Sequence, residues 1–176
     1  MVNKVKTATV IGLNAYQVFV ETDVINSLPS FSIVGLPDTA INEARDRVRS
    51  AIKNSGFTFP AKKVVINLAP ADLKKEGSNF DLPIAIGLIT EEGILEPEKL
   101  DNYAFIGELS LDGSLRGING VLPLILGLKE EGIKNVFVPY VNAKEAALAG
   151  SDMNIFGAQS LSDVVNHFSE APLKQT

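Results

Sequence analysis

The chain has 176 residues, which is the size of one domain or at most two small ones. Its 45% hydrophobic and 21% charged residues exclude a disordered protein and predict a sizeable core. With no cysteine, the chain has no disulfide framework, thiolate nucleophile or cysteine metal site, and its single histidine, His167, excludes a multi-histidine metal centre. No apolar run is long enough to span a membrane and no signal peptide opens the sequence, so we expect a cytoplasmic location.

The spacing of apolar and turn residues predicts four strands and one helix in the first part of the chain. Asp38 is placed to cap the helix and Gly56 to end it. In chain order, we expect a hairpin of two strands over 4–22 with its turn at 12–15, a strand over 30–35, the helix from 38 to 55, and a strand over 63–68.

Helices and strands alternate in the second part of the chain. Asp81 is placed to cap the first of these helices, and Asp112-Gly113 is a strong turn signal. We expect a helix over 82–91, a strand over 103–111, a helix over 122–131, a strand over 135–138, and then a helix over 142–149, a strand over 154–156 and a helix over 161–168. This order predicts an α/β (α+β) domain of two layers over residues 1–168, with residues 169–176 as a tail or linker.

The net charge of −5 argues against a dedicated nucleic-acid binder, but the charge is unevenly spread. Residues 43–63 carry six Lys and Arg side chains against two acidic ones. Within this segment Arg45, Arg49 and Lys53 recur at every fourth position, so they form one basic stripe on the predicted helix. We favour a solvated polar face for the basic stripe, with contact to phosphates or to an acidic neighbour as the alternative.

Common catalytic motifs are missing from the sequence. It contains no P-loop, no dinucleotide-binding glycine motif, no H-E-x-x-H and no G-x-S-x-G. His167 is near the end of the last predicted helix, where we expect a satisfied or solvent-facing surface histidine with no catalytic role.

Three stretches, at 31–60, 65–87 and 106–147, carry the motifs IVGLPD, NLAPAD, KEGSNFDLP and GELSLDG. With these motifs the chain resembles the N-terminal domain of the magnesium-chelatase-like AAA+ ATPases, the ChlI-like family that includes competence protein ComM. The resemblance covers nearly the whole chain. It implies a fold similar to domain 2 of ribosomal protein S5 and to the proteolytic domain of Lon.

The resemblance also implies a role. In this family the domain precedes an AAA+ module, outside this chain, that binds ATP and Mg²⁺, and full-length relatives imply hexameric, ATP-driven branch migration of DNA during natural transformation. The chain itself is then expected to hold no cofactor and no metal. It would act as a non-catalytic accessory domain whose partners are the AAA+ module, DNA and further copies in a homo-hexamer.

Lon proteases place a Ser–Lys dyad on this fold, and the resemblance puts the two dyad positions at Asn79 and Leu122. The serine is the nucleophile and the lysine its base, so the chemistry needs both side chains. Because an amide and an aliphatic side chain stand there instead, we expect no catalysis from these positions.

Two other functions stay open. The first is a degenerate Ser–Lys hydrolase that uses Ser78 and Lys75, although a lysine on a loop is expected to be solvated and protonated. Against it, Asp81 is expected to accept the free N–H groups of its helix that would otherwise bind an oxyanion. The second is a DNA-binding module that uses the basic stripe.

The loop over 69–80 is a further candidate interaction surface, with Lys74 and Lys75 as its cations. It is long and polar, and such loops on rigid scaffolds often carry function. The structural alternative is that Pro70, Asp72 and Gly77 fix its turns while Phe80 fills the core.

Overall fold

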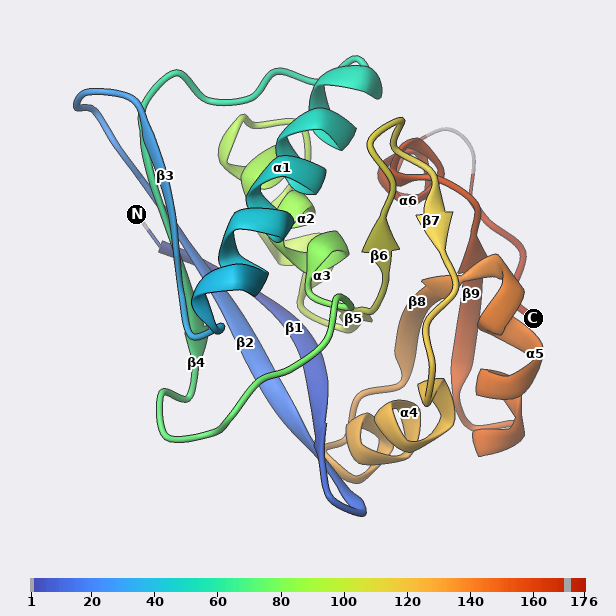
Figure 1. The fold of residues 1–176 in the computed structure, drawn as a ribbon. Coiled ribbons are helices and arrows are strands. Elements are labelled where there is room, and N and C mark those ends of the chain that lie inside the picture. Colours follow the sequence, from blue (N-terminus) through green and yellow to red (C-terminus); the bar gives the residue numbers. More distant parts are fainter. Residues whose placement is uncertain (1, 170–171) are drawn as a thin grey trace.

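The computed structural model describes residues 2–169 and 172–176, and its centre is one seven-stranded sheet. The strands follow the order β3-β4-β2-β1-β5-β8-β9 (Figure 1). Their bounds are β1 Val2–Ile11, β2 Asn14–Ile25, β3 Ser30–Val34, β4 Lys63–Ala69, β5 Tyr103–Phe105, β8 Asn135–Pro139 and β9 Asn154–Ala158. Only the β1–β2 and β2–β4 pairs are antiparallel, so the sheet is mixed and mostly parallel.

The helices cover both faces of this sheet. They are α1 Asp38–Asn54, α2 Asp81–Glu91, α3 Pro97–Leu100, α4 Val121–Glu130, α5 Ala143–Ala146 and α6 Leu161–His167, with 3-10 turns at Tyr140–Asn142 and Ala147–Ala149. Buried residues of α1, α2 and α6 share one core cluster, and those of α4 and α5 share a second. The α/β prediction is confirmed.

The number of layers differs along the sheet. Strand β8 is buried at four consecutive positions, because Phe137 faces the first cluster and its neighbours Val136 and Val138 face the second. Strand β4 instead alternates between buried and half-buried positions, because only one of its faces meets helices. The predicted two layers are therefore found at β3 and β4, and a third layer is added by α4 and α5.

The hairpin prediction is confirmed, with a shorter turn than expected. Ile11 pairs with Asn14, so Gly12 and Leu13 alone form the turn. Gly12 has φ of +62°, a left-handed conformation that glycine adopts without strain.

Two helix ends test the capping predictions. Asp38 is the first residue of α1 and Pro37 holds the cap position without a side-chain bond, so the prediction that Asp38 is the cap is wrong. An acidic side chain in the first turn still favours the helix through its dipole. Gly56 follows the C-cap Ser55 with φ of +84°, which confirms that it ends the helix.

The strand predicted over 103–111 is broken. Strand β5 ends at Phe105, and β6 (Glu108–Leu109) pairs with β7 (Leu115–Arg116) in a separate small sheet. Gly107 lies between β5 and β6. Its main-chain N–H donates to the Asn79 carbonyl at 3.1 Å, which draws the chain toward the start of α2. The Asp112-Gly113 turn is confirmed, since the Asp112 carboxylate accepts the Ser114 N–H at 3.0 Å.

The end of the described chain lies against the edge strand β9. The Thr176 N–H donates to the Ile155 carbonyl at 2.8 Å, and Gln175 forms an isolated bridge with Phe156. Among the described residues, no helix has both the length and the apolar character needed to cross a membrane.

Candidate functional site

The start of α2 is the first candidate site, because one of the two dyad positions, Asn79, lies directly before it, close in sequence to Lys75 and Ser78. The helix begins at Asp81, directly after the 69–80 loop, and its residues are buried from Asp81 to Thr90. Phe80 is 1% exposed and fills the core, as the structural alternative for the 69–80 loop predicts. A polar side chain in this position is therefore desolvated and needs a partner.

Asn79, which occupies the nucleophile position of the dyad, makes structural contacts. The residue is 8% exposed, and its Nδ2 donates to the Ala8 carbonyl of β1 at 3.0 Å. Its own carbonyl accepts the Gly107 N–H at 3.1 Å. Asn79 thus joins the loop to the central strand β1 and to the chain between β5 and β6.

Asp81 forms a buried ion pair with Arg47. The guanidinium donates to both carboxylate oxygens, at 2.6 and 3.1 Å, and Oδ2 also accepts the Leu109 N–H at 3.1 Å. Burial raises the pKa of Asp81 to about 6, and the hydrogen bonds from Arg47 and the Leu109 N–H oppose this rise. The hydrogen bond to Asp81 raises the pKa of Arg47.

The prediction that Asp81 caps its own helix is therefore wrong. Its oxygens are taken by side-chain and main-chain donors from α1 and β6, and no side-chain cap is formed at α2. Arg47 was missed as its partner. Its spacing was a usable signal, because it lies three residues after Ala44 and four before Ala51, both of which are buried.

Ser78 and Lys75 make separate contacts. The Ser78 hydroxyl donates to the Glu108 carboxylate at 2.5 Å, whereas the Lys75 ammonium donates to the Pro70 carbonyl within its own loop. Lys75 is 2% exposed, so the prediction that it is solvated is wrong. Burial lowers the pKa of Lys75, but its nitrogen is bonded to a carbonyl and not to the serine.

Leu122, at the lysine position of the dyad, belongs to a different part of the core. It lies in the first turn of α4, packs against the cluster under α4 and α5, and its N–H donates to the Glu145 carboxylate at 3.2 Å. Lys129, further along α4, donates to the Ala149 carbonyl at 2.7 Å and pairs with Asp152. The structure thus gives Asn79 and Leu122 separate structural roles.

The basic stripe only partly agrees with the prediction of a solvated face. Lys53 is exposed, but Arg45 and Arg49 are half-buried. Arg45 donates to the Phe31 carbonyl at 2.9 Å, and the Arg49 guanidinium lies 5.7 and 5.4 Å from the ring centroids of Phe31 and Phe59. No described carboxylate forms an ion pair with any of the three cations.

His167 and Lys74 complete the predicted residues. His167 is half-buried, with its ring among aromatic side chains that include Phe137 and Phe156, and its Nδ1 accepts the Leu173 N–H at 2.9 Å. Of the two alternatives for His167, the satisfied histidine is therefore found and the solvent-facing one is not. Lys74 is exposed and pairs with Glu76 at 2.9 Å. Within residues 2–169 and 172–176, no three metal-ligating side chains are grouped together.

Known proteins match most of this chain. A family model described as subunit ChlI of Mg-chelatase matches residues 20–142. Competence protein ComM of Haemophilus influenzae is 46% identical over 154 residues, which is 88% of this chain and 30% of that protein. The uncharacterized protein YifB of Salmonella typhimurium is 44% identical over 97% of this chain and 34% of its own length.

A more distant match extends to proteases. Lon protease 2 of Bacillus subtilis is 24% identical over 72% of this chain and 22% of its own length. The chain thus spans about a third or less of the length of the relatives that it matches.

Proposed function

The chain belongs to the family of the Mg-chelatase subunit ChlI, and from this premise we propose that it is a non-catalytic accessory domain of an AAA+ ATPase. The observation that carries the proposal is the contact of Asn79 with the Ala8 carbonyl. The position of a nucleophile must present its side chain to a substrate, whereas this side chain is buried and bonded to the central strand.

ATP and Mg²⁺ enter the proposal only through the AAA+ module. The sequence has no P-loop, and the described residues do not form a metal-ligand group, so the residues present do not fit this cofactor pair. We assign no step in this chain to them. The module would use them to drive movement of DNA, with this domain packed beside it in a cytoplasmic hexamer.

The test compares this chain alone with the same chain joined to the AAA+ module of a ComM-like relative. The chain alone is expected to show neither ATP turnover nor casein cleavage. Lys129→Ala is the blank for ATP turnover, because Lys129 lies in 127–134, a stretch whose glycines and lysines superficially resemble a phosphate loop. The joined protein is expected to hydrolyse ATP with Ser78→Ala as well as without it. ATP turnover by the chain alone above the Lys129→Ala blank, or casein cleavage that is lost with Ser78→Ala, would overturn the proposal.

A second function, contact with DNA phosphates, is supported by the basic stripe. Arg49 has no described hydrogen-bond partner for its guanidinium N–H groups, and the rings of Phe31 and Phe59 hold it in place. Such a stripe of cations contacts phosphates and does not read bases.

The DNA test measures anisotropy of a labelled branched DNA at several salt concentrations. Three phosphate contacts predict a log–log slope of roughly −2 to −3. The triple variant Arg45→Gln, Arg49→Gln and Lys53→Gln is expected to lose binding. The matched control replaces three exposed lysines elsewhere, namely Lys134, Lys144 and Lys174, with Gln. Equal binding by the two triple variants would rule out the stripe as the DNA contact.

A further inference from the structure

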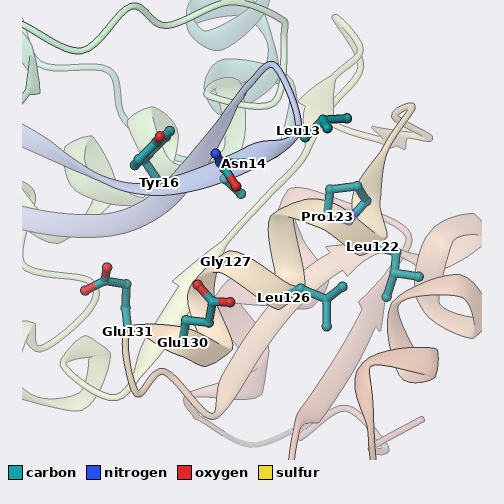
Figure 2. A pocket seen from close by; sticks show the side chains of 10 residues that line it. Leu13, Asn14, Tyr16, Leu122, Pro123, Leu126, Gly127, Glu130 and Glu131 are labelled. Atoms are coloured by element: carbon teal, nitrogen blue, oxygen red, sulfur yellow. The ribbon is translucent and has the colours of Figure 1, made fainter.

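A groove of about 550 Å³ lies between the tip of the β1–β2 hairpin and the outer side of α4. Figure 2 shows that its two ends differ in chemistry. Apolar side chains line one end, and two carboxylates line the other. The apolar residues are Leu13, Leu122, Pro123 and Leu126, and the carboxylates are Glu130 and Glu131.

At the apolar end, Leu13 and Leu126 are exposed and belong to neither core cluster, whereas Leu122 is half-buried. Leu13 is 98% exposed at a two-residue hairpin turn, where Asn, Asp or Gly is usual. Leu126 is 42% exposed one helical turn beyond Leu122. Apolar side chains gathered at the surface beside a hollow mark an interaction site.

The hairpin and the helix hold the groove in a fixed shape. Gly127 of α4 faces Ala15 of β2, and a Cβ at Gly127 would lie 2.5 Å from the Ala15 Cβ. Only glycine allows this close approach of the two backbones, so the hairpin tip rests directly on the helix. A ligand would therefore meet walls that are already formed, which lowers the entropy lost on binding.

A second hollow continues the first and adds more carboxylates. The two hollows share Tyr16 and Glu131, and the second is also lined by Phe19, Leu73 and Asp72. Its one cation, Lys4, pairs with Glu21 of the same hollow at 3.8 Å. No described Lys or Arg forms an ion pair with Asp72, Glu130 or Glu131. The combined surface is therefore apolar and aromatic along its floor and negatively charged along its rim.

One edge of strand β2 is open beside this surface. Strand β4 pairs with β2 only from Phe19 to Ile25, so among the described strands β1 alone pairs with residues 14–18 of β2. The free main-chain groups along such an edge pair with an added extended segment.

We propose that this surface binds an extended segment of another polypeptide whose apolar side chains alternate with Arg or Lys. The apolar side chains would pack against Leu13, Leu122 and Leu126, and the basic side chains would meet Glu130 and Glu131. Charge complementarity selects a basic partner, because the unpaired charges on the rim are all negative. The proposal is independent of the accessory-domain and DNA functions.

The test uses fluorescence anisotropy with a labelled six-residue peptide of alternating leucine and arginine. Charge reversal by Glu130→Lys with Glu131→Lys is expected to weaken binding at least about fivefold, as two lost rim contacts would. The matched control, Glu92→Lys with Glu98→Lys, places the same charges at exposed positions beyond the groove and is expected to leave binding unchanged. Leu126→Ser is expected to weaken binding without changing charge.

Three results would overturn the proposal. One is equal binding by the Glu130→Lys, Glu131→Lys variant and the control. Another is equal binding of a peptide that alternates serine and arginine, since charge alone would then explain the affinity. The third is self-association of the chain in sedimentation that the Glu130→Lys, Glu131→Lys variant abolishes, because the occupant would then be a second copy.

Discussion

The start of α2 and the groove at α4 both carry several charged side chains, but these charges differ in their burial and in their partners. At α2, Asp81 is 1% exposed and is bonded to Arg47 and to the Leu109 N–H. At α4, Glu130 and Glu131 are exposed and form no ion pair with a described residue. A buried charge with its partners holds the fold together, whereas an exposed charge beside apolar side chains is available to a ligand.

The largest effect is expected from breaking the buried pair. Asp81→Ala leaves Arg47 and the Leu109 N–H without their acceptor, and such losses cost about 3–5 kcal/mol of unfolding free energy. Urea unfolding of Asp81→Ala and of the parent protein measures this loss of unfolding free energy. The double variant Asp81→Ala, Arg47→Met is expected to lose less than the sum of the two single variants, because it leaves no unpaired charge. Strict additivity would show that the two side chains do not interact.

A smaller effect is expected at Asn79. Asn79→Ser shortens the side chain and removes the donor to the Ala8 carbonyl, which leaves a buried acceptor unpaired at about 1–3 kcal/mol. Urea unfolding and a casein assay measure the two consequences together. We expect lower stability and no peptidase activity. Unchanged stability would mean that the bond to β1 contributes nothing.

The contrast between these regions also shows what the sequence alone predicts. Apolar spacing predicted the hairpin, α1, α2 and β4 to within a few residues, because each depends on local periodicity and turn residues. It did not predict the break after Phe105, which follows from a hydrogen bond between Gly107 and Asn79, far away in the chain.

The candidate site was less predictable for the same reason. Local rules place an acidic side chain at a helix start as a cap and a loop lysine in solvent. In this fold, tertiary contacts override both rules, since Asp81 meets Arg47 of another helix and Lys75 is covered by its own loop. The groove carries no motif at all, because it arises where the hairpin tip crosses α4.

A pH effect of moderate size is expected at His167. Burial lowers the pKa of His167 in the folded state, and the Leu173 N–H requires a neutral Nδ1 as acceptor. Stability from the neutral ring is therefore complete above the unfolded pKa of about 6.5 and is lost as the pH falls through the lower folded pKa. The melting temperature of the protein, relative to His167→Phe, should fall in this range. If the difference in melting temperature between the protein and His167→Phe stayed constant over this pH range, the prediction would be wrong.

The smallest effect is expected for the exposed pair of Lys74 and Glu76. Lys74→Ala removes a contact between two side chains that are 74% and 64% exposed, where solvent and salt screen the attraction. Thermal melting should not distinguish this variant from the parent protein. A clear loss of stability would show that the 69–80 loop depends on this surface pair as well as on buried Lys75.

The central claim is that the start of α2 is structural and not catalytic, and labelling with a fluorophosphonate probe tests it most directly. The probe reacts with serines that are activated as nucleophiles, and Ser78 is the serine nearest in sequence to the dyad position. We expect no labelling of the protein above the level of its Ser78→Ala variant, because the Ser78 hydroxyl is bonded to Glu108 and Lys75 is bonded to Pro70. Labelling that maps to Ser78 and disappears with Lys75→Met would contradict the account.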